Sequence, residues 1–200
     1  MEKMNFKKEM DNITKYAKIM YDRGLVSASG GNISVLVSDN KYLITSSGSS
    51  FRDLNYDDIV LSDFDGNILD DEDSKKKPSK EYRIHSKCYL ERKDIFSVVH
   101  LHPCYSIAFT SYNVDLPLFT SSAKLKLKNV PMVDEELPGS EELAYKVGES
   151  VKINSESKCF LIKAHGIVVF SSSIEDCLDL AELMEDTAKI ALFSKNFIKE

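Results

Sequence analysis

The stretch Phe96-Ser97-Val98-Val99-His100-Leu101-His102-Pro103 decides how this chain is interpreted. Its apolar, β-branched centre predicts a buried strand, which Pro103 ends because proline cannot donate to a sheet ladder. Side chains two residues apart on a strand point to the same face, so the imidazoles of His100 and His102 leave the sheet together. The pair therefore stands at a strand end, where a site opens onto a loop.

A second strand end carries a third histidine. His165 follows the apolar run 159–164 and precedes Gly166, whose missing side chain lets backbone approach closely. The chain has only 4 histidines, so this placement is a sparing use of the residue. Three neutral imidazoles with one open position form a catalytic zinc arrangement, in which the metal acts as a Lewis acid. The alternative is that His100 and His102 are hydrogen-bonded core residues.

A glutamate stands at the start of a predicted helix. Pro78-Ser79-Lys80-Glu81 opens this helix, which runs to about Glu91 and has Glu81 in its first turn. Acidic residues are favoured there by the helix dipole, which would explain Glu81 without any function. The functional interpretation is a general acid–base catalyst whose pKa is tuned by a metal and by partial burial. His85, four residues later on the same face, is expected to be a structural or orienting partner rather than a ligand.

Composition bounds the class of protein. With 200 residues, 42% of them hydrophobic and 29% charged, the chain predicts one soluble domain over residues 1–200. A net charge of −6 argues against a nucleic-acid partner. No apolar run reaches membrane-spanning length and no signal-peptide core is present, so we expect no membrane partner and a cytoplasmic location. The 4 cysteines form no C-x-x-C pair and are expected to be reduced.

Hydrophobic periodicity predicts an α/β fold. Helices are expected over residues 5–23, 80–91 and 141–153 and in a long C-terminal segment, where Ser172 and Glu175 have capping-box spacing. Strands are expected near residues 33–37, 42–45, 59–61, 68–69, 97–102, 130–133, 159–164 and 167–170. The charged stretch 70–77 is expected to be a solvated loop. Several strands are joined by short turns, which predicts layered αβα architecture with a mostly antiparallel or mixed central sheet.

Three small-residue segments have the composition of anion-binding loops. Gly31 and Asn32 lie in one, Ser47 and Gly48 in another, and Ser79 stands before the helix that contains Glu81. Free backbone N–H groups at glycine turns and helix starts bind anions, and Ser79 is also a good helix cap. Each segment taken singly is equally explained as a turn. None matches a dinucleotide-binding or Walker pattern.

Taken in order, these segments resemble the class II aldolase/adducin family, over a span from about Leu25 to the last helix. The matching segments are Ser29–Ser34, Ile44–Gly48, Asp58–Val60, Lys77–Glu81, His85, Val98–Pro103 and Ala164–Gly166. The resemblance implies a central, mostly antiparallel sheet flanked by helices, in a homotetramer with active sites between subunits.

The resemblance also implies the roles of the site residues. One Zn²⁺ per subunit, with Mn²⁺ as the alternative, would be held by His100, His102 and His165. Glu81 would be the catalytic residue, shuttling a proton, and a fourth ligand in the resting state. The phosphate of the substrate would be cradled by Gly31, Asn32, Ser47, Gly48 and Ser79.

The implied activity is that of a zinc-dependent lyase of the fuculose-phosphate aldolase type, which cleaves a small phosphorylated ketose through a metal-stabilised enediolate. Two positions depart from those aldolases: Lys80 replaces a second serine, and Glu135 stands where they carry a tyrosine acid. The Lys-Pro-Ser-Lys-Glu form is more similar to relatives that decarboxylate 3-oxo-tetronate 4-phosphates. In such a site Lys80 would bind a substrate carboxylate or add charge at the phosphate; a solvated surface lysine is the alternative.

Other fates of the same intermediate remain open, namely epimerisation and dehydration. A non-catalytic, adducin-like interaction module is the remaining possibility. It is disfavoured because such a module has no need of the complete set of metal-binding residues.

Overall fold

Seven strands form one sheet in the computed structural model, which describes residues 2–69 and 76–194. The spatial order is β3-β2-β1-β4-β7-β6-β5. The strands are β1 Asn32–Ser38, β2 Lys41–Thr45, β3 Ile59–Asp63, β4 Ser97–Leu101, β5 Met132–Val133, β6 Cys159–Ile162 and β7 Gly166–Ser171. Within the described residues only β5 and β6 pair in parallel, and the other neighbours are antiparallel.

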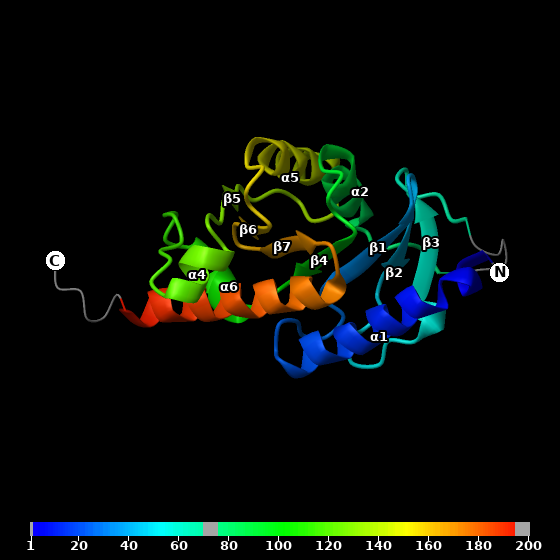
Figure 1. The fold of residues 1–200 in the computed structure, drawn as a ribbon, viewed down its shortest axis with the longest axis horizontal. Helices are drawn as coiled ribbons and strands as arrows, with labels where there is room; N and C mark the ends of the chain where they lie inside the picture. The colour runs from blue at the N-terminus through cyan, green and yellow to red at the C-terminus, as the bar shows by residue number, and fades with distance from the viewer. Residues whose placement is uncertain (1, 70–75, 195–200) are drawn as a thin grey trace.

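Helices cover both faces of this sheet (Figure 1). The α-helices are α1 Lys7–Asp22, α2 Tyr82–Glu91, α3 Cys104–Thr110, α4 Ser121–Lys126, α5 Glu141–Ile153 and α6 Ile174–Ser194, with short 3₁₀ helices η1 Glu2–Phe6 and η2 Tyr56–Asp58. Helices α1 and α6 lie on one face, and α2 and α5 lie on the other. Each face has its own buried hydrophobic cluster. The layered αβα architecture with a mostly antiparallel sheet is therefore confirmed.

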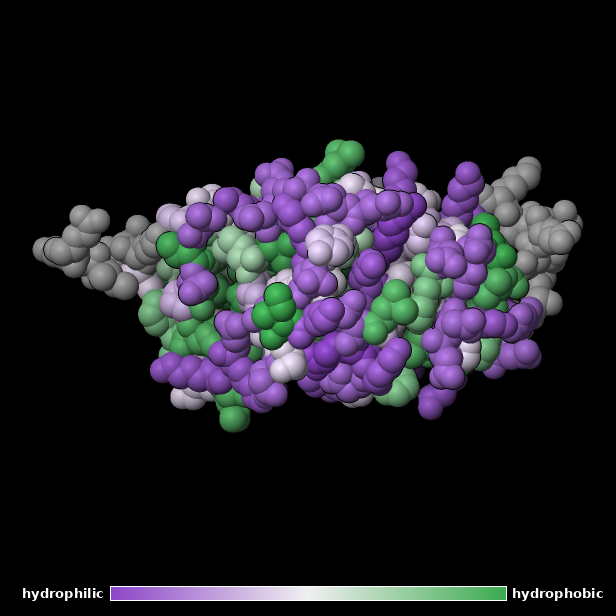
Figure 2. Space-filling view, turned by 90° about the horizontal axis from the view of Figure 1, so that it is seen from above, coloured by the Kyte–Doolittle hydropathy of each residue, from purple (hydrophilic) through white to green (hydrophobic). Residues whose placement is uncertain are grey.

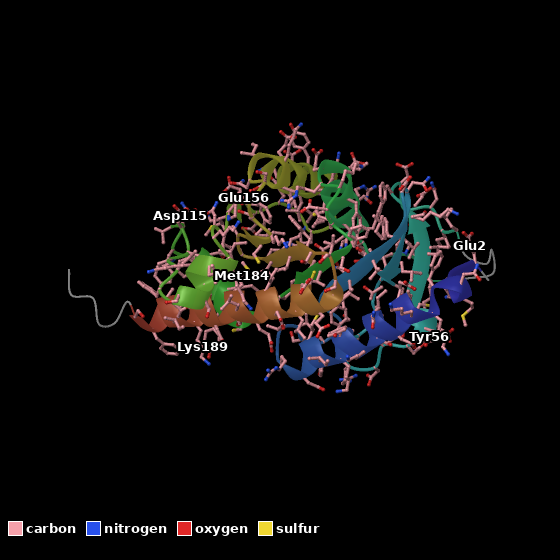
Figure 3. The ribbon with its side chains drawn as sticks, in the orientation of Figure 1. Glu2, Tyr56, Asp115, Glu156, Met184 and Lys189 are labelled. Carbon is pink, nitrogen blue, oxygen red and sulfur yellow. The ribbon has the colours of Figure 1, made fainter. Side chains whose placement is uncertain are left out.

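The hydrophobic patterns explain which side of each helix is buried. On α6, every position of the expected apolar stripe is buried: Ile174, Cys177, Leu178, Ala181, Met184, Ala188 and Ala191. Met184 lies on the sheet side of this helix, whereas Lys189 points away from it (Figure 3). On the face covered by α5 and α2, the outer surface is mainly hydrophilic, with scattered apolar residues (Figure 2). Across residues 2–69 and 76–194, every helix is too short or too polar to traverse a lipid bilayer.

Several boundaries differ from the sequence-based expectations. Helix α4 was not expected, because its six residues are too few to show a periodic pattern. Residues 68–69 form no strand, and Ile68 makes only an isolated bridge to Ser62. The hydroxyl of Ser173, not Ser172, accepts from the Asp176 amide at the start of α6. Of the charged stretch 70–77, residues 70–75 lie outside the described residues.

Helix α2 begins two residues later than expected, at Tyr82 instead of Lys80. Glu81 is the residue that precedes its first helical position, Tyr82, and so is not in the first turn. The Glu81 amide donates to the hydroxyl of Ser79 at 3.3 Å, and the Tyr82 amide donates to the Ser79 carbonyl. These bonds hold Glu81 in the turn that leads into the helix. Its carboxylate is therefore aimed by the turn and by the contacts described next.

Candidate metal centre and substrate cavity

The three predicted histidines converge because β4 and β7 are antiparallel neighbours. His100 lies on β4 opposite Val168 of β7, His102 follows the end of β4, and His165 lies in the turn that leads from β6 into β7. The Nε2 atom of His100 is 2.9 Å from Nε2 of His102 and 3.2 Å from Nε2 of His165. Two strand ends thus bring three imidazoles together from positions 65 residues apart.

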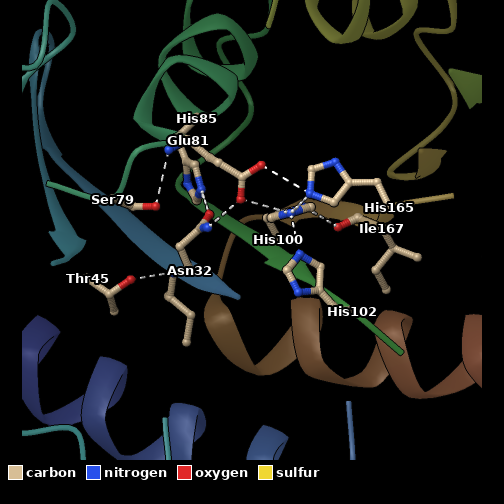
Figure 4. Close-up of polar contacts among 10 residues, drawn as sticks. Asn32, Thr45, Ser79, Glu81, His85, His100, His102, His165 and Ile167 are labelled. Atoms are coloured by element: carbon tan, nitrogen blue, oxygen red, sulfur yellow. Dashed lines mark hydrogen bonds and ion pairs between the residues drawn. The ribbon is translucent and has the colours of Figure 1, made fainter. Parts of the chain in front are cut away.

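The carboxylate of Glu81 completes this cluster (Figure 4). Its Oε2 lies 3.1 Å from His100 Nε2, and its Oε1 lies 3.2 Å from His165 Nε2. One ligand atom from each of Glu81, His100, His102 and His165 lies within 4.8 Å of the others. We call these four residues the metal cluster.

The hydrogen bonding of His100 turns a lone pair toward the cluster. Its Nδ1 lies 2.9 Å from the carbonyl oxygen of Ile167, which can only accept, so Nδ1 carries the proton. In the neutral ring Nε2 is then unprotonated. Metal-binding histidines are commonly fixed in this way, with the outer nitrogen donating to a carbonyl or carboxylate.

The spacing of the donor atoms fits a tetrahedral ion. Zinc–nitrogen bonds of about 2.0–2.1 Å place ligand nitrogens about 3.3 Å apart, and the two observed separations of 2.9 and 3.2 Å are close to that value. Nitrogen lone pairs this close repel one another unless a proton or a cation lies between them. Imidazole and carboxylate donors suit zinc and manganese, so the residues present fit a divalent cation.

Burial and neighbouring side chains shift the pKa values of two members of the metal cluster. Burial alone would raise the pKa of Glu81, but the adjacent imidazoles of His100 and His165 hold that pKa well below its usual range. For His102, burial followed by the proximity of His100 lowers the pKa to about 4. Glu81 is thus an ionised carboxylate and His102 a neutral imidazole near pH 7, as metal ligation requires.

Close packing explains the paired glycines that precede β1. A Cβ atom on Gly30 would lie 2.8 Å from Nδ1 of His102. Gly31 has a φ of +79°, and a Cβ atom there would lie 2.7 Å from Val26 and 3.1 Å from the carbonyl oxygen of His100. Both positions therefore have no room for a side chain beside the metal cluster.

A cavity of about 290 Å³ opens beside the cluster. It brings together every residue that was expected to bind substrate, namely Gly31, Asn32, Ser47, Gly48, Ser79 and Lys80, together with Glu81 and His102. Gly30, from the same glycine turn as Gly31, also lines it, together with three residues that were not expected: Ser29, Ser46 and Pro138. A larger hollow of about 520 Å³, between α2, α5 and the turn after β3, contains no member of the metal cluster.

Ser46 and Pro138 were missed for different reasons. The Ser46 hydroxyl is buried and has no hydrogen-bond partner among the described residues, and its position directly before Ser47 was the available signal. Pro138 comes from the loop after β5, whose return to the cavity requires the tertiary structure. Glu135, on the same loop, is exposed and does not line the cavity.

Asn32 has a second role that the sequence did not predict. Its Nδ2 donates to Glu81 Oε2 at 3.1 Å, and its Oδ1 contacts Nε2 of His85. His85 is fully buried, and this burial lowers its pKa to about 3. The expectation that His85 is a partner and not a ligand agrees with this geometry, because Asn32 stands between His85 and the carboxylate (Figure 4).

Comparison with known proteins gives a consistent result. Residues 11–192 match the family described as the Class II Aldolase and Adducin N-terminal domain. An L-fuculose phosphate aldolase of Methanococcus maripaludis is 34% identical over 187 residues, which cover 94% of this chain and 97% of the relative. A 3-oxo-tetronate 4-phosphate decarboxylase of Haemophilus influenzae is 30% identical, with 89% of this chain and 84% of the relative covered.

A solved structure shows the same fold. The crystal structure of L-fuculose-1-phosphate aldolase from Thermus thermophilus superposes with a TM-score of 0.82, at 23% identity and with 94% of each chain covered.

Proposed function

Because this chain belongs to the class II aldolase and adducin family, we propose that it is a metal-dependent lyase that cleaves a small phosphorylated ketose, in the manner of an L-fuculose phosphate aldolase. The sequence-based expectation of a lyase of this family is confirmed by its relatives. The observation that carries the specific proposal is the metal cluster, which borders a cavity lined by glycine and serine.

The proposed metal ligands are His100, His102 and His165, with Glu81 as a fourth. The proposed ion is Zn²⁺, one per subunit, with Mn²⁺ as the alternative. When bound, such an ion polarises a carbonyl oxygen and stabilises negative charge on the substrate. His100 is held for this role by its bond to the Ile167 carbonyl.

The phosphate of the substrate is proposed to bind at the opposite part of the cavity. Gly48 has a φ of +81°, which turns the backbone after Ser47 into a loop. The Ser47 and Ser49 amides of this loop donate to the carbonyls of Lys77 and Ser46, so among the described residues the Gly48 amide is left to bind an anion. Ser79 keeps a hydroxyl proton to donate, because its oxygen accepts from the Glu81 amide. Gly31 and Asn32 close the other side of the cavity.

Glu81 is proposed to move the proton. Its carboxylate is ionised, borders the cavity and lies against two imidazoles. A carboxylate placed in this way can take a proton from a substrate carbon or hydroxyl and return it when the carbon–carbon bond has broken. The turn that holds Glu81 also presents Ser79 to the phosphate, so one segment orients both ends of a short substrate.

Decarboxylation of a 3-oxo-tetronate 4-phosphate is the second candidate. Lys80 lines the cavity, and within residues 2–69 and 76–194 no acceptor is paired with its ammonium group. A free cation at this place suits a substrate that carries a carboxylate in addition to its phosphate. The relative from Haemophilus influenzae is named for that reaction.

The experiment that separates the two candidates supplies the purified, zinc-loaded protein with each substrate. Fuculose 1-phosphate should release lactaldehyde and dihydroxyacetone phosphate, whereas a 3-oxo-tetronate 4-phosphate should release carbon dioxide. Failure of both reactions, in protein that contains stoichiometric zinc, would contradict the proposal and leave the epimerase and dehydratase alternatives. The homotetramer and the cytoplasmic location remain predictions from the sequence.

A further inference from the structure

A row of hydrogen-bonding side chains leads from Glu81 into the protein, between β1 and α2. Asn32 and Ser34, two residues apart on β1, share one face of the sheet. Glu81, directly before α2, is followed at four-residue intervals by His85 and Tyr89, which share one side of that helix. Four helical residues rise about 6 Å and two strand residues about 6.7 Å, so the two rows stay in step.

Each member of this row contacts the next. After the Glu81–Asn32 and Asn32–His85 contacts, His85 Nδ1 lies 2.7 Å from Ser34 Oγ, and Ser34 Oγ lies 2.8 Å from the Tyr89 hydroxyl. Ser34 and His85 are completely buried, and Tyr89 and Asn32 are 2% and 3% exposed. We call Ser34, His85 and Tyr89 the relay.

The chemistry of the groups fixes the direction of every bond. Ionised Glu81 only accepts, so the NH₂ group of Asn32 faces it, and the amide oxygen of Asn32 must then accept from His85 Nε2–H. In a neutral imidazole Nδ1 only accepts, so Ser34 donates its single hydroxyl proton to it. Ser34 has no further proton, which leaves Tyr89 as the donor to Ser34. All donors therefore point toward the carboxylate.

We propose that Ser34, His85 and Tyr89 are positioning residues, which hold the Asn32 amide with its NH₂ group toward Glu81 and thereby fix the orientation of that carboxylate. The proposal rests on the proposed function, in which Glu81 binds the metal and moves the proton. Without the donor at His85 Nε2, rotation of the amide would bring the Asn32 oxygen against Glu81 Oε2 and repel it.

The same hydrophobic layer offers matched control residues. The Tyr42 hydroxyl bonds to Ser86 Oγ at 3.1 Å, and the Tyr42 ring lies 5.8 Å from that of Tyr89. Tyr42 and Ser86 are buried, as are Tyr89 and Ser34, the relay residues that they match. No hydrogen bond among the described residues connects Tyr42 or Ser86 to His85. Tyr42→Phe and Ser86→Ala therefore lose a buried hydroxyl without touching the relay.

The first test reads the relay directly and needs no substrate. Nitrogen-15 NMR of histidine-labelled, zinc-loaded protein reports which ring nitrogen carries a proton, and His85→Phe identifies the signal among the 4 histidines. We expect neutral His85 with the proton on Nε2, both in the wild type and in Tyr42→Phe. A proton on Nδ1, or on both nitrogens at pH 7, would overturn the proposal.

The second test measures how firmly Glu81 is held. Zinc affinity, from competition with a chromophoric chelator, should fall about 10-fold in Ser34→Ala and His85→Phe. With the substrate that the wild type converts, kcat should fall about 10-fold in Ser34→Ala and Tyr89→Phe, with KM unchanged. Ser86→Ala and Tyr42→Phe should match the wild type in both measurements.

Denaturant unfolding of the metal-free variants separates positioning from stability. Positioning is supported if a relay variant and its control lose equal stability but the relay variant binds zinc more weakly. Equal zinc affinities of the two variants would overturn the proposal. If the wild type converts neither substrate, the proposed function fails, and the tautomer and zinc affinity still decide on the relay. If the wild type is active and relay variants behave like their controls, only the relay fails.

Discussion

Gly166 lies so close to Leu101 that a Cβ atom on the glycine would stand 2.3 Å from the leucine carbonyl oxygen. The same atom would lie 2.8 Å from His102 and 3.3 Å from His100. Because backbone is the nearest obstacle, Gly166→Ala should lower the free energy of unfolding of the metal-free protein by about 3 kcal/mol and abolish zinc binding.

Urea denaturation and elemental analysis would test that expectation. The control is Gly148→Ala in α5, where the three atoms nearest to the added Cβ all belong to the Lys87 side chain and the closest, its Cβ, lies 3.3 Å away. Alanine also favours the helix by up to about 1 kcal/mol. Equal stability of the two variants would contradict the account of Gly166.

His102 is the ligand to remove when the metal is to be lost with the least damage. It follows the end of β4 and is only partly buried, whereas His100 is completely buried on the central strand. We expect His102→Ala to lose stoichiometric zinc and turnover while the metal-free protein stays within about 1 kcal/mol of wild type. His100→Ala should lose the metal too, at a larger cost in stability, because it leaves a cavity in the sheet. Retention of zinc by His102→Ala would remove it from the ligand set.

Glu81→Gln tests the proton transfer. The amide is of similar size, but it cannot take up a proton, so kcat should fall by about 10²–10⁴-fold. Zinc should remain bound by the three imidazoles, as measured in the same preparation. A variant with wild-type kcat would show that Glu81 is not the catalytic residue.

Lys80 should govern the choice between the two candidate substrates. Lys80→Met removes the free cation and keeps the length of the side chain. If the cation binds a substrate carboxylate, kcat/KM should fall about 10–100-fold for a 3-oxo-tetronate 4-phosphate and little for fuculose 1-phosphate. Equal losses on both substrates would instead place Lys80 at the phosphate. No loss on either would identify it as a solvated surface residue.

Acid should destabilise the metal-free protein through His85. Its pKa is about 3 in the folded state and about 6.5 in an unfolded chain, so unfolding takes up a proton between these values. The contribution is therefore complete above about pH 6.5 and is lost as the pH falls toward 3, on the order of 1 kcal/mol per pH unit. Glu81 and His102 act in the same direction, so the informative comparison is with His85→Phe. The wild type should show the steeper fall in unfolding free energy; parallel curves would contradict the assignment.

The sequence predicted the fold where periodicity was strong. Helix α5 occupies the expected residues 141–153, and the buried stripe of α6 follows the three-and-four spacing. It missed α4, which is too short for a periodic signal, and placed the cap of α6 one residue early because Ser172 and Ser173 offer the same hydroxyl. A local sequence pattern cannot decide which of two adjacent serines caps a helix.

The sequence predicted those site residues that lie in recognisable local motifs. The two strand ends that carry His100 and His165 were evident from apolar runs. The link from His85 through Asn32 to Glu81 was not, because the sequence does not say that α2 lies along β1. Once that packing is known, the four-residue spacing of Glu81, His85 and Tyr89 explains why all three side chains face β1.

Strand β4 has three strands on either side of it, in the order given by the sheet. Fraying in a folded protein begins at borders and termini and reaches the middle last. Transient unfolding of an edge strand, β3 or β5, should therefore leave the distances between the donor atoms of the metal cluster unchanged. The metal cluster is therefore anchored on the strand that is expected to open least often, and opening of the outer strands should leave it intact.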